Sequence, residues 1–357
     1  MIWHNAGAIG VAETSSLAVK VFRLGTNSGW AGVQLFFVLS GFLITGILLK
    51  AKETESPLRI FYTRRILRIF PLYYACLFFF FVLLPLFDVL PAVYQGDYQY
   101  QLWYWFYQSN WSNAALDGNG LAHFWSLAIE EQFYLVWPLV VYFVSRRTLI
   151  GVCISLVLSA IASRFYMTYF WGDFGLQASY SFTNARWDAL AIGSMMAIAN
   201  SDPDMSRSLR SYSKSFLLAG FLLILSAIAI NKNFAATGFG SASLNQTLIA
   251  LWFAAVIGVS ISSAGSEIGE KLRKFLSSRP LATLAKYSYG MYVVHIPLLR
   301  LVMPKVSDEA ESYDGLQLLA ASNAFCIVVT IASLLVAMAT WRLIENPFLR
   351  LKSKFNY

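Results

Sequence analysis

Apolar runs about as long as a bilayer is thick recur along this chain, and they constrain its fold more than any other feature. Two of them are LYYACLFFFFVLLPLF at 72–87 and CIVVTIASLLVAMATW at 326–341. An α-helix of about 20 apolar residues crosses the ~30 Å hydrocarbon core of a membrane. Only 13% of the residues are charged, whereas soluble domains carry about 25%. The sequence therefore predicts an all-α, polytopic transmembrane helix bundle and excludes a soluble globule.

The runs divide the chain into about nine expected membrane spans. They belong to a single integral membrane domain over residues 1–357, with no separate soluble domain. The expected spans are 30–49, 69–90, 124–144, 148–170, 184–200, 215–231, 247–263, 284–303 and 317–341.

The basic residues indicate how these spans are oriented. The chain carries 27 lysines and arginines and a net charge of +8. Most of them fall in alternate connections between the spans, and the positive-inside rule places those connections in the cytoplasm. Membrane topology explains this clustering better than a nucleic-acid partner does, so no nucleic acid is expected. Cys76, Cys153 and Cys326 lie in apolar stretches without ligand spacing, which predicts no metal site.

Three arginines stand at the cytoplasmic entrance to the second span, in FYTRRILRIFPLYY at 61–74. Arg68 shares a helix face with Arg64 or Arg65, three or four residues earlier. One interpretation is ordinary positive flanking of a span. The other is a set of guanidinium groups that binds the phosphates of a cytoplasmic ligand, since arginine matches phosphate geometry in a bidentate way.

Two adjacent carboxylates interrupt the next span, in HFWSLAIEEQFYLVWPL at 123–139. Ionisable residues at membrane depth are costly and mark a functional site by default. Glu130 and Glu131 are neighbours and cannot face the same way, so one of them can be structural. A buried, hydrogen-bonded glutamate that stabilises the bundle is the alternative. His123 heads the segment as a polar boundary residue.

Other polar residues in apolar surroundings have simpler explanations. Arg186 and Asp188 are expected to form a mutual or cross-helix ion pair near the outer boundary. His295 is either a hydrogen-bonded packing residue or part of a site. Glu345 is expected to pair with a nearby arginine at the cytoplasmic interface.

Taken together, the motifs closely resemble acyltransferase family 3, a family of integral membrane acyltransferases. The resemblance covers residues from about 30 to 350 and rests on the ordered set GVQLFFVLSGFLITG, FYTRRILRIFPLYY, FWSLAIEEQFYLVWP, ARWDALAIG, YSYGMYVVHIP and WRLIENPF. It implies about ten membrane helices and transfer of an acyl group, commonly acetyl, to glycan hydroxyls. Its donor-associated arginine motif is matched by Arg65 and Arg68, and its essential first-span histidine by His4 in IWHN. The resemblance also implies that the first span is truncated here.

These residues suggest a mechanism for O-acylation. His4 is the expected general base, with Glu130 orienting it or relaying the proton. The phosphates of an acyl-CoA would bind Arg65 and Arg68, with Arg64 assisting. Acetyl-CoA or another acyl-CoA is thus a co-substrate, and no permanently bound cofactor is expected. The expected partners are this donor, an envelope polysaccharide or lipid-linked glycan acceptor, and the bilayer of a bacterial inner membrane.

Two alternatives remain open on the sequence. Intramembrane Glu, Arg and His also suit a proton-coupled transporter or flippase for a glycan or lipid precursor, although no inverted repeat is evident. A truncated first span would also be compatible with an inactive scaffold.

Overall fold

The computed structural model describes residues 30–52, 54–115, 120–231, 244–262, 267–310 and 315–355, and no strand occurs in these ranges. The α-helices are α3 (Ala31–Ala51), α4 (Pro57–Phe78), α5 (Leu84–Leu86), α6 (Gln95–Gln99), α7 (Gln101–Trp105), α8 (Ser109–Ala115), α9 (Phe124–Phe143), α10 (Arg146–Phe170), α11 (Gly172–Ser181), α12 (Trp187–Asn200), α13 (Pro203–Asn231), α14 (Gln246–Ser262), α15 (Glu267–Leu276), α16 (Arg279–Ala310), α17 (Gly315–Thr340) and α18 (Asn346–Leu351). The π-helical turns are η1 (Phe79–Leu83) and η5 (Trp341–Glu345), and the 3₁₀ turns are η2 (Ala92–Tyr94), η3 (Thr183–Ala185) and η6 (Lys352–Lys354).

The helical membrane bundle predicted from the sequence is confirmed. Each expected span overlaps a helix in the described ranges. In the described ranges, four helical stretches are long and apolar enough to cross a membrane: Ala31–Ala51, Pro57–Leu86, Arg146–Phe170 and Ala320–Leu351. The expected spans 69–90 and 215–231 each start 12 residues after the first residue of the helices that they overlap, α4 and α13, whereas the expected span 184–200 opens with a 3₁₀ turn that α12 follows.

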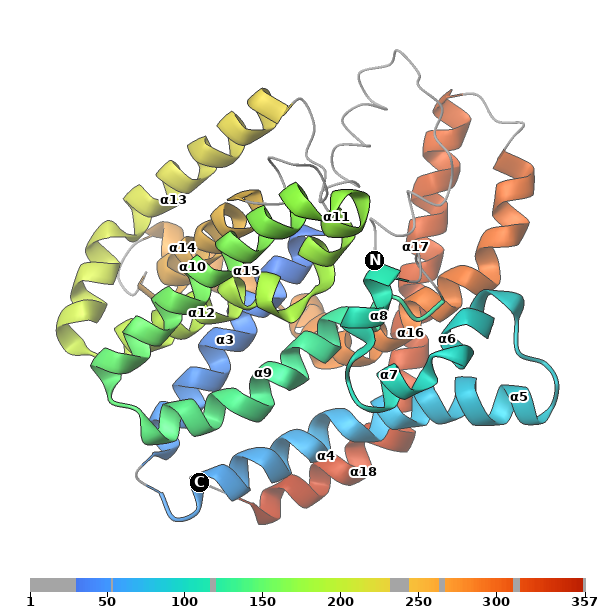
Figure 1. Cartoon of the computed structure of the whole chain (residues 1–357), viewed down its shortest axis with the longest axis horizontal. Coiled ribbons are helices and arrows are strands. Elements are labelled where there is room, and N and C mark those ends of the chain that lie inside the picture. Colours follow the sequence, from blue (N-terminus) through green and yellow to red (C-terminus); the bar gives the residue numbers. More distant parts are fainter. Residues whose placement is uncertain are drawn as a thin grey trace.

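Two groups of helices make up the bundle, and α9 belongs to both of them. In the first, α3 packs against α12, α14 and α9, and α10 packs against α12. In the second, α16 packs against α17, while α4 contacts α16, η5 and α18 (Figure 1). Trp125 and Ile129 on α9 belong to the first core, whereas Phe124 and Leu127 belong to the second. The polar residues of α9 therefore lie where the two groups meet.

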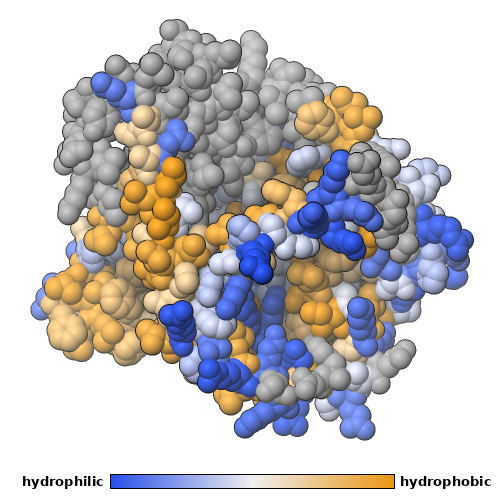
Figure 2. Space-filling model, turned by 180° about the vertical axis from the view of Figure 1, so that it is seen from behind, coloured by the Kyte–Doolittle hydropathy of each residue, from blue (hydrophilic) through white to orange (hydrophobic). Residues whose placement is uncertain are grey.

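Much of the outer surface is apolar, as a lipid environment requires. Leu135 and Phe143 on α9, Leu158 on α10 and Leu335 on α17 are exposed. Figure 2 shows broad hydrophobic areas on one face of the molecule, next to a lower region where hydrophilic side chains gather.

The contact between α3 and α12 depends on two glycines. A Cβ atom added at Gly41 would overlap the carbonyl of Leu190, and one added at Gly193 would overlap the carbonyl of Val38. The two backbones approach closely because neither position carries a side chain, which is the packing mode that small residues allow in membranes.

We expect Gly41→Ala to destabilise the bundle, because the added methyl group must push α3 away from α12. The expected cost is about 1–3 kcal/mol, typical of overpacking, measured as a lower Tm of the detergent-solubilised protein. Gly46→Ala on the same helix is the matched control, since a Cβ there meets no atom within 4 Å. Equal melting temperatures for the two variants would contradict the close contact.

The segment between α4 and α9 is organised around a buried carboxylate. Asp97 is fully buried on α6, where its Oδ2 accepts a hydrogen bond from the Leu121 backbone N–H at 3.0 Å and its Oδ1 accepts one from the Tyr104 hydroxyl. Burial raises the pKa of Asp97 to about 6, although the hydrogen bonds from Tyr104 and Leu121 act in the opposite direction. The segment is tied to α4 because the Tyr73 hydroxyl donates to the Tyr104 carbonyl at 2.8 Å.

This raised pKa predicts that the protein loses stability as the pH rises. The folded state binds the Asp97 proton more tightly than the unfolded state does, so the stabilisation is complete below pH ~4 and is lost as the pH passes through about 6. At ~1.4 kcal/mol per pKa unit, the effect is about 3 kcal/mol. The Tm should therefore fall between pH 4.5 and pH 7 in the native protein and change less in Asp97→Asn. The same pH dependence in both proteins would contradict the assignment.

Candidate functional site

A cationic pocket opens on the side that the positive-inside rule assigns to the cytoplasm. It has a volume of about 400 Å³ and lies between the end of α3, the start of α4 and the C-terminal segment. Its lining residues are Ile44, Ile47, Lys50, Ala51, Phe61, Arg64, Arg65, Arg68 and Lys352. The three arginines singled out in the sequence therefore share one pocket, and none of its described lining residues is acidic.

The C-terminal segment holds two of these arginines. Arg64 Nη1 donates to the Phe355 carbonyl at 3.0 Å. Arg68 Nη1 lies 3.9 Å from Oε2 of Glu345, a buried residue at the end of the π-helical turn η5. The expected pairing of Glu345 with an arginine is confirmed. Single π-helical turns occur frequently at functional sites, and this one places a carboxylate behind the pocket.

Two lysines complete the pocket, and the sequence reasoning did not single them out. Lys50 lies in the last turn of α3, and Lys352 directly follows α18. Burial and the positive charges of Arg64, Arg68 and Arg65 lower the pKa of Lys352. The crowding of these cations favours a multiply charged anionic ligand, whose binding would relieve their mutual repulsion.

Arg65 connects the pocket to the bundle interior. Its guanidinium lies over the ring of Tyr134 on α9, 3.8 Å from the ring centroid. The Tyr134 hydroxyl in turn donates to Oε1 of Glu130 at 3.0 Å, and Ser40 also hydrogen-bonds to Glu130. The spacing of Glu130 and Tyr134, four residues apart on one helix face, was a signal for this contact that the sequence reasoning overlooked.

The two adjacent glutamates have different environments. Glu130 is buried with 3% of its surface exposed, whereas Glu131 is half-buried. Glu130 therefore faces the junction between the two helix groups, and its hydrogen bonds with Tyr134 and Ser40 hold its carboxylate there. The prediction that the two adjacent side chains face different ways agrees with this difference.

A line of polar side chains continues along α9, on the side of Glu130 away from the cationic pocket. Ser126 lies one turn before Glu130, and its hydroxyl contacts the Tyr292 hydroxyl at 2.5 Å. The Tyr292 hydroxyl also donates to the His123 carbonyl at 2.6 Å. From Tyr134 to His123 this line covers 11 residues of α9, or about 16 Å. It extends away from the cationic pocket along the helix.

Two histidines that the sequence left ambiguous meet at the end of this line that is farther from the pocket. The rings of His123 and His295 have centroids 5.1 Å apart. His123 Nε2 lies 3.2 Å from the Val293 carbonyl, and His295 Nδ1 lies 2.7 Å from the Tyr292 carbonyl. Both side chains are buried. His123 is thus buried inside the bundle at the start of α9. His4 lies outside the described residues.

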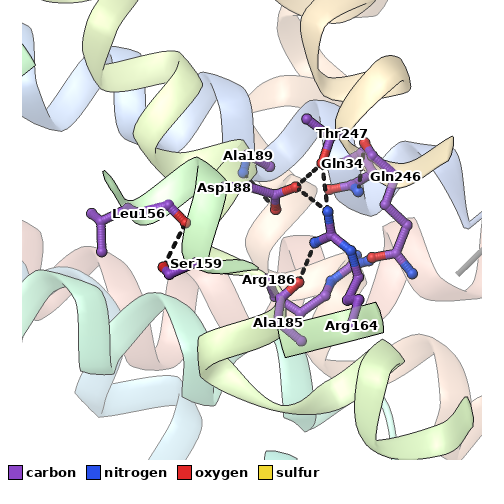
Figure 3. Close-up of polar contacts among 10 residues, drawn as sticks. All are labelled: Gln34, Leu156, Ser159, Arg164, Ala185, Arg186, Asp188, Ala189, Gln246 and Thr247. Carbon is purple, nitrogen blue, oxygen red and sulfur yellow. Dashed lines mark hydrogen bonds and ion pairs between the residues drawn. The ribbon is translucent and has the colours of Figure 1, made fainter. Parts of the chain in front are cut away.

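A second polar cluster joins α3, α10, α12 and α14 (Figure 3). Arg164 Nη2 and Asp188 Oδ2 are 3.0 Å apart and fully buried. The Thr247 hydroxyl donates to the same carboxylate, and Arg186 donates to the side chain of Gln246. The cross-helix ion pair expected for Asp188 is present, and its partner is Arg164 on α10.

The fold and these motifs define a class of protein, and comparison with known proteins identifies the family. The chain matches the model of acyltransferase family 3, described as an acyltransferase domain, over residues 1–342. It therefore belongs to this family and is a multi-pass bacterial membrane protein, as predicted.

Several bacterial proteins are similar to this chain. It is 30% identical over 376 residues to the peptidoglycan O-acetyltransferase OatA of Listeria monocytogenes, a match that covers 98% of this chain and 56% of the relative. The Bacillus subtilis protein YrhL is 31% identical over 316 residues, with 84% and 49% covered. The O-acetyltransferase OatA of Staphylococcus aureus is 26% identical over 315 residues, with 82% and 50% covered. The chain thus spans about half the length of these relatives. No solved structure matches it significantly.

Proposed function

We propose that this chain is an O-acyltransferase of the bacterial inner membrane. It moves an acetyl group from a CoA-type donor, bound at the cytoplasmic pocket, to a hydroxyl of a cell-envelope glycan. Family membership supports acyl transfer, and the names of the relatives favour peptidoglycan as the glycan. A transporter is disfavoured because the family that matches the chain consists of acyltransferases.

The proposal rests on one observation above all: the cationic pocket adjoins the line of polar side chains on α9 that runs from Tyr134 to His123. Five basic side chains line the pocket, which suits the phosphates of coenzyme A. Arg65 belongs both to the pocket and to the contact with Tyr134. A donor whose phosphates bind there can direct its long thioester arm along α9, towards the outer half of the bundle.

The proposed reaction is a direct transfer. The oxygen of the glycan hydroxyl attacks the thioester carbonyl, and its proton passes to a general base. The C–S bond breaks, and the thiolate takes up a proton from the conjugate acid of that base to give free CoA. We assign His4 as the base on the family motif, because imidazole accepts and returns protons near neutral pH.

Glu130 is the proposed carboxylate partner of the base. Its buried position and its hydrogen bonds from Tyr134 and Ser40 fix the carboxylate in one orientation. A carboxylate held in this way can orient an imidazole and stabilise the imidazolium that forms during transfer.

The proposal is tested by acyl transfer in membranes that express the 357-residue chain. Acetyl-CoA labelled in the acetyl group is added, and alkali-labile label in envelope glycan is counted against membranes with an empty vector. Ester-linked label above this control supports the transferase. A transporter would leave the glycan unlabelled, although labelled donor and acceptor are both present.

A further inference from the structure

Arg186 is a fully buried cation outside the proposed donor site. It directly precedes α12, and aromatic rings surround its guanidinium: the Cζ atom lies 5.7 Å from the ring centroid of Phe37, 5.3 Å from Trp125 and 5.2 Å from Tyr180. Cation–π contacts of this kind stabilise a guanidinium that has been removed from water. The rings supply no hydrogen-bond acceptor for its N–H groups, which lie in the guanidinium plane.

One edge of this guanidinium carries hydrogen-bond donors that are not used. Arg186 Nη1 donates to Gln246 Oε1, but Nε and Nη2 are buried and have no hydrogen-bond partner among the described residues. Nε and Nη2 share the edge of the guanidinium that binds the two oxygens of a carboxylate side by side. Next to it, Gln246 Nε2 and Gln34 Oε1 are also buried, and neither has a hydrogen-bond partner in the described part of the chain. Figure 3 shows these three residues converging beside the Arg164–Asp188 pair.

The nearby carboxylate does not neutralise Arg186. Asp188 Oδ2 is used by Arg164 and Thr247, and its Oδ1 accepts from the Ala189 N–H at 2.9 Å. In the part of the chain that the structure describes, no carboxylate oxygen lies within 4.0 Å of a nitrogen of Arg186. A buried charge without a counter-ion is destabilising by several kcal/mol, so its presence calls for a ligand.

The position of Arg186 places this charge at the end of the bundle away from the donor pocket. At the other end of α12, the Ile198 carbonyl accepts from Arg146 at 2.6 Å, at the predicted cytoplasmic boundary. The 14 residues of α12 separate Arg186 from that boundary by about 20 Å. Trp125, which contacts the guanidinium, precedes Ser126 of the polar line on α9.

We propose that Arg186, with Gln246 and Gln34, forms a subsite for an oxyanion carried by the acceptor saccharide. A carboxylate fits the free guanidinium edge best, and a sugar phosphate offers the same chemistry. The amide groups of Gln246 and Gln34 would bind hydroxyl or amide groups beside the anion. This inference rests on the proposed function, since it assigns the acceptor of that reaction as an anionic glycan.

The test uses the purified full chain in lipid nanodiscs and measures saccharide binding directly by titration. The probes are the N-acetylglucosamine–N-acetylmuramic acid disaccharide with a free carboxylate, its neutral methyl ester and the 1-phosphate of the ester. We expect the native chain to bind the free acid about tenfold more tightly than the ester. Arg186→Gln should abolish this preference while the affinities for the ester and for acetyl-CoA stay unchanged. If the 1-phosphate binds more tightly than the ester, the subsite also accepts phosphates. If the 1-phosphate and the ester bind equally, the subsite accepts carboxylates only.

A second variant keeps the test decisive if Arg186→Gln does not fold. Gln246→Glu supplies an internal carboxylate next to Arg186, so it should raise or preserve the Tm and remove the preference for the free acid. Three results would overturn the subsite: equal binding of acid and ester by the native chain, no binding of the acid by a chain that still acetylates envelope glycan, or an unchanged preference in either variant. Acetyl-CoA binding and transfer, measured in parallel, show separately whether the proposed function holds.

Discussion

Replacing Arg65 by glutamine is expected to weaken acetyl-CoA binding by about 10–100-fold. A hydrogen bond to a charged group contributes about 1.5–3 kcal/mol, and tenfold in affinity corresponds to about 1.4 kcal/mol. Arg65 lines the pocket and stacks on Tyr134, so the substitution removes a phosphate ligand and loosens the contact between pocket and interior. Titration of the purified chain with acetyl-CoA measures the effect.

Two variants separate this role from general charge effects. Arg59→Gln removes an exposed positive charge from the same helix, outside the pocket lining, and should leave the affinity within about twofold of the native value because exposed charges are screened by salt. Arg65→Lys keeps the charge but loses the planar guanidinium, and should bind the donor with intermediate affinity. If Arg59→Gln and Arg65→Gln weakened binding equally, the pocket would be only a region of positive potential.

Replacing Glu130 by glutamine is expected to lower kcat for acetyl transfer by about 10²–10⁴-fold, the range of a general acid–base contribution. Glutamine keeps the shape of the side chain and can still accept the hydrogen bond from Tyr134, so the loss is confined to the charge. The affinity for acetyl-CoA should stay near the native value, because Glu130 does not line the pocket. Steady-state kinetics with labelled donor separate kcat from KM.

Glu131→Gln is the matched control for this prediction. It changes the adjacent, half-buried carboxylate on a different face of α9, and kcat should stay within about fivefold of the native value. A fall in kcat for Glu131→Gln as large as that for Glu130→Gln would assign the effect to the local charge of the segment instead of to one oriented carboxylate.

The sequence predicted the helices well because their signal is local. Apolar runs such as the one at 326–341 identify a span without reference to any other part of the chain. The start of the second helix was predicted less well, since α4 begins at Pro57, 12 residues before the expected span. Residues 57–68 carry four arginines, so hydropathy identifies the apolar part of this helix but not its first turns.

The candidate site was predictable only where its residues are close in sequence. Arg64, Arg65 and Arg68 were grouped by their spacing on one helix, and the structure places them in one pocket. Lys352 joins them from nearly 300 residues away because α18 packs against α4 (Figure 1). Likewise, the contact of His123 with His295 depends on how α9 and α16 meet, and no local pattern encodes that.

In the proposed reaction, the acetyl group is delivered by a donor bound in the cytoplasmic pocket and is transferred to an acceptor in the outer half of the bundle. The most direct measurement uses sealed proteoliposomes with the chain in one orientation, the pocket facing outwards and the acceptor glycan enclosed in the lumen. Acetyl-CoA labelled in the acetyl group is added outside only. We predict that ester-linked label appears on the enclosed glycan with the native chain and that it is absent with the Arg65→Gln variant. Label that appeared only on glycan added to the same side as the donor would contradict it.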